Sequence, residues 1–198
     1  MASTSQTEFS AEDFDQALRA LDTEIGKSKN MSKIAPLQLL SAGGFVAVTI
    51  FHNRLSTQDI DYIMGPDTPN VNKIKEKLQN AIETMEIFAI GPNKQRLFRD
   101  SVTQNVVVWR GVNLVTYAAK WEWTLARKLK RIGSERRAID ISDAVEILFR
   151  MVQENGGPLA LETVKSWDTI VYTPLDMAAI KSVADAYIER WGIAGIKM

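Results

Sequence analysis

The stretch over residues 39–64, LLSAGGFVAVTIFHNRLSTQDIDYIM, decides the fold that we predict for this chain. It indicates a strand, a turn at Gly43-Gly44, a short helix, and a second strand that carries Asp59 and Asp61. Successive side chains of a β-strand point to opposite faces of the sheet. The two aspartates, which are separated by one residue, are therefore expected to lie on the same face.

These two carboxylates and the glycine turn predict a site for a magnesium-bound nucleotide. Two carboxylates side by side repel each other unless a cation lies between them. Mg²⁺ binds carboxylate and phosphate oxygens, and glycine lets the backbone approach a phosphate closely. Alternatively, the glycines form a plain structural turn and the aspartates are ordinary surface acids at the end of a strand.

The composition is that of an ordinary globular chain. Of the 198 residues, 45% are hydrophobic and 24% are charged, which suits one domain or one domain with a small second lobe. There are 24 basic and 24 acidic residues, so no overall field attracts the chain to a long nucleic acid or an acidic membrane. The absence of cysteine excludes disulfides and thiolate metal sites. Without a membrane-spanning or signal-peptide pattern, a cytoplasmic location is expected.

The pattern of predicted elements changes near residue 118. The first part mixes strands with helices and the second part is nearly all helix, so we predict an α+β fold with a mixed sheet flanked by helices and a C-terminal helical lobe. The expected parts are 1–118, which includes an N-terminal helix, and 119–198. In the first part we expect helices at 10–25, 45–52 and 71–85, strands at 37–40, 59–64, 87–90, 106–109 and 114–117, and a polar connection at 94–104. In the second part, helices are expected to begin near residues 120, 139, 159 and 174.

The order of the glycine turn and the two aspartates resembles the signature of the nucleotidyltransferase superfamily. That signature is an apolar residue, Gly, Gly or Ser, a gap, and then Asp, an apolar residue and Asp. The chain has Gly43-Gly44 followed by Asp59-Ile60-Asp61. The residues just before the acids, Arg54, Ser56 and Thr57, are similar to those of the small toxin-like and antibiotic-modifying members.

A basic helix further along the chain extends the resemblance to residues 36–150. The segment 126–131, ARKLKR, is followed by Arg136-Arg137 and by Asp140 and Asp143, and in this branch a lysine on such a helix faces the nucleotide phosphates. One side of the helix is expected to carry Thr124, Arg127, Lys128 and Arg131, opposite an apolar stripe of Trp121, Leu125 and Leu129. A merely solvated helix face would show the same pattern.

The resemblance implies a nucleotidyltransferase-like sheet and a reaction that needs Mg²⁺ or Mn²⁺. A nucleoside triphosphate would be the substrate, and a nucleoside monophosphate would pass to a small-molecule or unknown acceptor with release of pyrophosphate. Asp59 and Asp61 would be the catalytic and metal-binding residues. The expected nucleotide-binding residues are Ser41, Gly43, Gly44, Arg54, Thr57, Lys128 and Arg131.

The chain departs from the family pattern at the third carboxylate, which acts as general base. The strand expected at 106–109 should carry this acid, but it contains none. Asp100 is the nearest candidate and lies in the expected polar connection. A missing general base typically lowers a rate by about 10²–10⁴-fold.

We therefore consider two alternative functions in addition to that of an active nucleotidyltransferase. One is a non-catalytic protein of this fold that binds a nucleotide or a partner, and the other is a pocket repurposed for a different small-molecule reaction. An acid near Asp59 and Asp61 in space, such as Asp100, would favour the enzyme. A pocket floored by Val106, Val108 and Arg110 would favour the other two. The sequence does not indicate an oligomeric state.

Overall fold

The computed structural model describes residues 8–58, 60–65, 92–135 and 137–198. The chain divides into two compact units, Met1–Ala119 and Lys120–Met198. The expected helix at 71–85 and the expected strand at 87–90 lie outside the described residues, as does Asp59. Each unit is described below by itself.

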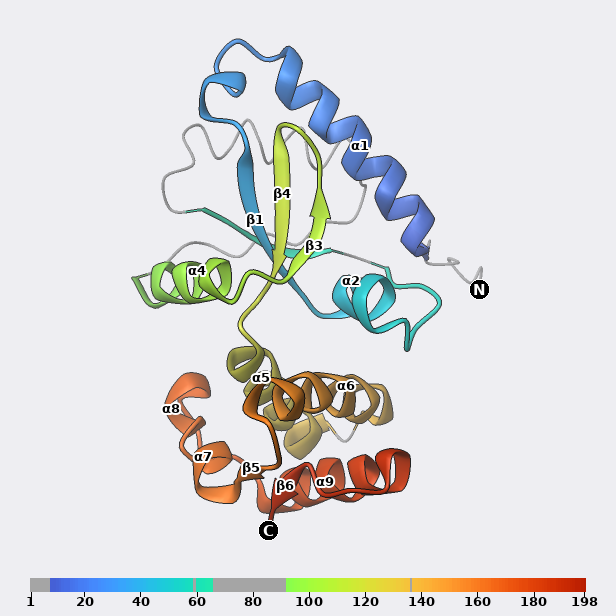
Figure 1. The fold of residues 1–198 in the computed structure, drawn as a ribbon, viewed down its shortest axis with the longest axis vertical. Coiled ribbons are helices and arrows are strands. Elements are labelled where there is room, and N and C mark those ends of the chain that lie inside the picture. Colours follow the sequence, from blue (N-terminus) through green and yellow to red (C-terminus); the bar gives the residue numbers. More distant parts are fainter. Residues whose placement is uncertain (1–7, 59, 66–91, 136) are drawn as a thin grey trace, which may run out of the picture. The chain divides into compact units, whose positions relative to one another are not determined.

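The first unit is built on a four-stranded mixed sheet in the order β2-β1-β4-β3 (Figure 1). Its strands are β1 (Leu37–Ala42), β2 (Asp61–Met64), β3 (Val107–Arg110) and β4 (Leu114–Ala118). β1 is antiparallel to β2 and parallel to β4, and β4 is antiparallel to β3. The expected strands over these residues and the α+β fold class are confirmed.

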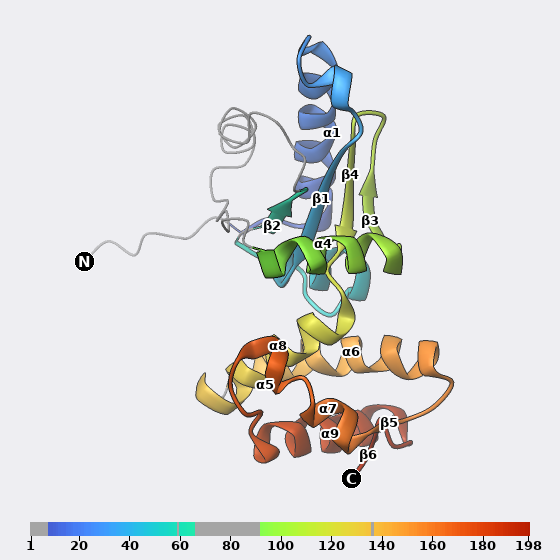
Figure 2. The same cartoon turned by 90° about the vertical axis from the view of Figure 1, so that its left-hand side faces the viewer.

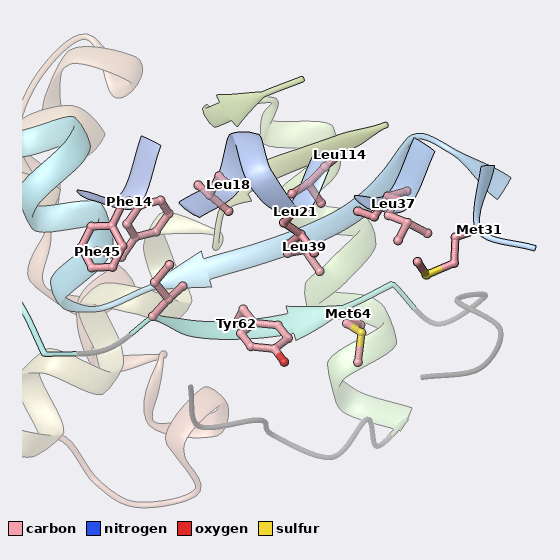
Figure 3. Close-up of a cluster of buried hydrophobic side chains, with 12 residues drawn as sticks. Phe14, Leu18, Leu21, Met31, Leu37, Leu39, Phe45, Tyr62, Met64 and Leu114 are labelled. Atoms are coloured by element: carbon pink, nitrogen blue, oxygen red, sulfur yellow. The ribbon is translucent and has the colours of Figure 1, made fainter. Parts of the chain in front are cut away.

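The helix α1 (Ala11–Lys27) covers one face of this sheet. Its apolar stripe, Phe14, Leu18, Leu21 and Ile25, is buried against side chains of the strands and of the short helix α2 (Gly44–Val46). Figure 3 shows this cluster, to which the sheet contributes Leu37, Leu39, Tyr62, Met64 and Leu114. The spacing of the α1 residues places them on one side of a helix, as the sequence predicts.

The helix α4 (Pro92–Gln104) lies on the opposite side of the sheet from α1 (Figure 2). The prediction of a polar connection at 94–104 is therefore wrong. Leu97, Phe98 and Ser101 are buried, and their spacing is that of one helix face. Only two of these three side chains are apolar and charged residues surround them, so the periodic signal is weak.

Two aspartates of α1 hold the β3–β4 hairpin. Asp15 Oδ1 accepts a hydrogen bond of 2.9 Å from the indole nitrogen of Trp109, and hydrogen bonds from Arg19 and Trp109 hold the pKa of the Asp15 carboxyl below its usual value. Asp22 accepts hydrogen bonds from the backbone amides of Asn113, at 2.7 Å, and Val112, at 3.3 Å. These contacts fix the hairpin turn to a helix that is distant in sequence.

The second unit is mainly helical, as predicted. Its long helices are α5 (Trp121–Glu135), α6 (Ala138–Asn155) and α9 (Met177–Trp191). The helix expected over 159–170 is present as two short helices, α7 (Leu161–Lys165) and α8 (Asp168–Val171), and is preceded by a short strand, β5 (Leu159–Ala160). β5 pairs in parallel with β6 (Ile196–Lys197). The backbone of residues 159–160 therefore belongs to a two-stranded sheet and not to a helix.

No helix among the described residues is both long enough and apolar enough to span a bilayer.

Replacement of Asp22 by alanine should destabilise the first unit because the hairpin amides lose a charged acceptor. We expect a loss of about 1–3 kcal/mol in the free energy of unfolding, measured by urea denaturation. Glu24→Ala, on the same helix, is the control. Glu24 forms an exposed ion pair with Lys27, so this change should cost less than about 1 kcal/mol. Equal losses in the two variants would show that Asp22 does not hold the β3–β4 hairpin.

Candidate functional site

The turn at Gly43 and Gly44 ends β1 and begins α2. Gly43 has a φ of 71°, a region that side chains other than glycine adopt at a cost. The helical turn continues through a π-helical segment, Ala47–Phe51. The predicted glycine turn is therefore present, with the left-handed backbone that requires glycine at its first position.

The carboxylate of Asp61 lies directly against this turn. A Cβ atom built on Gly43 would be only 2.8 Å from Asp61 Oδ2. Asp61 is opposite Ala42 in the β1–β2 register, and the buried hydroxyl of Ser41 donates a 2.8 Å hydrogen bond to the Asp61 carbonyl. The structure thus brings together three of the predicted site residues, Ser41, Gly43 and Asp61.

Thr57 occupies the corresponding space beside Gly44. A Cβ atom on Gly44 would be 2.0 Å from Thr57 Oγ1, so no side chain fits there without moving Thr57. Arg54 belongs to the same loop and is half-buried. Two side-chain oxygens, one from Asp61 and one from Thr57, therefore lie against consecutive glycines.

Tyr62, the residue after Asp61, points into the core. Its side chain is buried in the cluster beneath α1, and burial raises the pKa of its hydroxyl. The phenol is therefore neutral at physiological pH, so it does not replace the missing carboxylate as a general base.

The strand β3, which was expected to carry the third carboxylate, contains no acid. No group of three or more potential metal-binding side chains occurs among the described residues, which do not include Asp59. Asp100 is on α4, where its carboxylate lies 3.6 Å from Arg96 Nε. The described structure gives no contact that would make Asp100 the general base.

A cavity of about 660 Å³ lies at the other end of β1. Among its lining residues are Pro36, Leu37, Phe98 and Arg99. Val106, Val108 and Arg110, which would floor the pocket of a repurposed protein, do not line this cavity.

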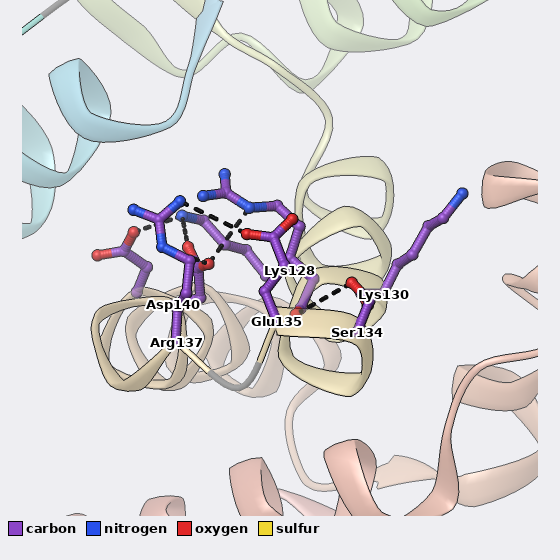
Figure 4. Close-up of polar contacts among 8 residues, drawn as sticks. Lys128, Lys130, Ser134, Glu135, Arg137 and Asp140 are labelled. Carbon is purple, nitrogen blue, oxygen red and sulfur yellow. Dashed lines mark hydrogen bonds and ion pairs between the residues drawn. The ribbon is translucent and has the colours of Figure 1, made fainter.

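Lys128 is buried in the second unit, where it joins α5 to α6. Its ammonium group lies 2.6 Å from Asp140 Oδ1 and 2.6 Å from Asp143 Oδ2. The exposed fraction is 5% for Lys128, 0% for Asp140 and 1% for Asp143. Figure 4 shows Lys128 directed toward Asp140 on α6, while Lys130 points away. The charge of Lys128 is therefore already balanced within the unit.

Two arginines complete this charged cluster at its more exposed side. Arg131 Nε is 3.3 Å from Asp140 Oδ2, and Arg137 Nε is 3.8 Å from the same oxygen. Arg137 also lies 3.9 Å from Glu135 Oε2. Three cations therefore face the three carboxylates of Glu135, Asp140 and Asp143, and the cluster is neutral. The two arginines are partly exposed, so their guanidinium groups are more accessible than the ammonium group of Lys128.

The prediction that Thr124 and Lys128 lie on an open polar face of α5 is wrong. Both residues are buried, because α5 packs against α6, α8 and α9 rather than against one neighbour. The sequence did contain a signal for the burial of the acids. Asp140 and Asp143 continue the helical spacing of the buried Ala144 and Ile147, and acids in an apolar stripe indicate a buried partner.

No model of a known protein family, no curated protein and no solved structure matches this chain. The function must therefore be argued from the site itself. A glycine turn with a carboxylate and a hydroxyl against it is suited to a cation and a phosphate. The cluster around Lys128 is suited to holding two helices together while exposing arginines.

Replacement of Gly43 by alanine should destabilise the first unit by more than backbone strain alone. An alanine at a φ of 71° is strained by roughly 1–2 kcal/mol, and its methyl group would also displace the Asp61 carboxylate. The control is the same Gly43→Ala change in an Asp61→Ala background, which keeps the backbone angles of φ 71° and ψ −142° and removes the carboxylate. Urea denaturation should give the larger loss when Asp61 is present. Equal losses would show that Asp61 does not crowd the turn.

Replacement of Lys128 by methionine should strongly destabilise the second unit. Two buried carboxylates would lose their common partner, and breaking a buried ion pair typically costs about 3–5 kcal/mol. The control is Lys130→Met on the same helix. Lys130 is exposed and its ammonium donates to the Val171 carbonyl at 3.3 Å, so we expect a loss of less than about 1.5 kcal/mol. Urea denaturation that gave similar losses for the two variants would rule out the clamping role.

Proposed function

We propose that the chain is a nucleotidyltransferase-like protein that binds a magnesium–nucleoside triphosphate and transfers the nucleoside monophosphate to a small-molecule acceptor. The observation that carries the proposal is the contact between the Asp61 carboxylate and the left-handed turn at Gly43. A carboxylate beside a glycine turn offers an oxygen to a metal ion, and the amides of such a turn can bind a phosphate.

The residues at the turn fit a divalent cation. The space that a Cβ atom would take at Gly43 is occupied by Asp61 Oδ2, and hard cations such as Mg²⁺ or Mn²⁺ prefer such oxygens. Asp61, together with Asp59, would hold the cation. When bound, it would neutralise charge on the triphosphate and polarise the reacting phosphoryl group.

The nucleotide-binding residues have distinct parts in this proposal. The backbone at Gly43 and Gly44 would approach the phosphates, and the Thr57 hydroxyl would donate a hydrogen bond to them. Ser41 would act indirectly, since its hydroxyl donates to the Asp61 carbonyl. Arg54 would contribute positive charge from the loop.

Within the second unit, the guanidinium group of Arg131 is more accessible to an anion than the buried ammonium group of Lys128. Both close partners of the Lys128 ammonium are carboxylates, and this group would have to leave them to reach a phosphate. Arg131 is partly exposed and shares Asp140 with two other cations. Lys128 would then hold the acids that orient Arg131.

A non-catalytic nucleotide-binding protein of the same fold is the second candidate. The observation in its favour is that β3, where the third acid of an active enzyme was expected, contains no acid. Such a protein would bind the magnesium–nucleotide complex but would not release pyrophosphate.

Calorimetric titration of Mg-ATP, Mg-CTP and Mg-GTP, and of the corresponding Mn²⁺ complexes, tests the proposal. We expect wild type to bind at least one of them and both Asp61→Asn and Asp59→Asn/Asp61→Asn to bind at least about tenfold more weakly, which corresponds to about 1.4 kcal/mol. Asp185→Asn, which changes an exposed acid paired with Lys181 on α9, is the control and should bind as wild type does.

The outcomes separate the two candidate functions. Absence of binding to wild type with either metal ion would overturn both. Equal binding by wild type and the Asp59→Asn/Asp61→Asn variant would remove the metal-holding role of these acids. If the nucleotide binds, a pyrophosphate-release assay with a mixture of hydroxyl-bearing metabolites distinguishes the enzyme from the non-catalytic protein.

A further inference from the structure

The residues just before α1 pair with the loop that leads to Asp61. The Phe9 amide donates a 2.8 Å hydrogen bond to the Thr57 carbonyl, and the Thr57 amide donates a 3.0 Å hydrogen bond to the Phe9 carbonyl. The Ser56 hydroxyl also donates to the Glu8 carboxylate. Glu8 and Phe9 therefore form a short strap across the loop, attached by backbone and side-chain contacts.

This pairing holds the loop at the residue that touches the glycine turn. Thr57 bonds to Phe9 through its backbone, while its hydroxyl lies against Gly44. Leu55, two residues before Thr57, is 92% exposed, so its side chain does not anchor the loop. The strap thus supplies contacts that fix the Thr57 side chain.

The strap is itself fixed at its other end. The Phe9 ring lies 5.9 Å from the ring of Phe14, which lies 4.9 Å from the ring of Phe45 in α2. Ser10, the next residue, caps α1: its hydroxyl accepts a hydrogen bond from the Asp13 amide, and its amide donates to the Asp13 carboxylate. A rigid helix start and an aromatic contact to α2 therefore set the position of Phe9.

We propose that Glu8 and Phe9 are positioning residues for the candidate phosphate and metal site. They hold Thr57 against Gly44 and so set the path by which the chain enters β2 at Asp61. As far as it concerns nucleotide binding, this inference rests on the function proposed above. Its effect on the geometry of the loop is independent of that function.

Phe9→Pro and Phe9→Leu form a matched pair for the test. Proline removes the amide that donates to Thr57, whereas leucine keeps the amide and an apolar side chain. The first readout is hydrogen exchange of the Thr57 and Asp61 amides in the full chain, followed by NMR or mass spectrometry. We expect exchange at least tenfold faster in Phe9→Pro than in Phe9→Leu, with α1 still protected in both variants.

The second readout is the affinity for the magnesium–nucleotide complex that wild type binds best. Phe9→Pro should bind it at least tenfold more weakly than Phe9→Leu does. Leu21→Ala, a cavity variant in α1, controls for a general loss of stability. A purely structural strap would weaken binding only in proportion to unfolding, so an equal effect in Phe9→Pro and in an equally destabilised Leu21→Ala would overturn the proposal.

The results also separate this inference from the proposed function. If wild type binds no nucleotide, the proposed function fails and the exchange comparison alone decides whether the strap positions the loop. Unchanged exchange at Thr57 and Asp61 in Phe9→Pro would overturn the strap whatever the binding result. If Phe9→Pro does not fold, Ser56→Ala is compared with wild type instead. This change removes only the hydrogen bond to Glu8 and should raise the exchange rate of the Thr57 amide by a smaller factor.

Discussion

The antiparallel pairing of β1 with β2 is the constraint on which the candidate site depends. Its register places Asp61 opposite Ala42, beside the turn that follows β1. A shift of one residue would move Asp61 to the face covered by α1 and would expose Tyr62. Since Tyr62 and Met64 are part of the core, burial of these side chains and placement of the carboxylate are set together. Hydrophobic packing of β2 thereby helps to fix the position of the carboxylate.

The second unit contains a lysine, Lys128, that is buried at the interface between α5 and α6. A buried ammonium is costly unless it is paired, and Asp140 and Asp143 supply two carboxylates at 2.6 Å. The acids in turn attract Arg131 and Arg137 to the more exposed side of the cluster. Lys128 therefore serves mainly the packing of α5 on α6, and the more exposed cations of the cluster are Arg131 and Arg137.

The sequence predicted most of the described fold but only part of the candidate site. Period-two and helical patterns located the sheet strands and α1, because one face of each is apolar. The same patterns missed α4, whose buried face is only Leu97, Phe98 and Ser101. The contact of Gly43 with Asp61 followed from motif order. The pairing of Phe9 with Thr57 could not be predicted, since it joins distant segments through backbone atoms that leave no trace in residue type.

The two consecutive glycines also help to decide between a plain turn and a ligand site. A left-handed φ at Gly43 explains one glycine, but it does not explain why the spaces beside both residues are filled by side-chain oxygens. An ordinary turn in this position would gain more from apolar side chains, because the adjoining core is hydrophobic. A carboxylate and a hydroxyl are groups that a cation and a phosphate can use, and they are the reason why we propose a binding role for the turn. An active enzyme would also need a general base from another residue.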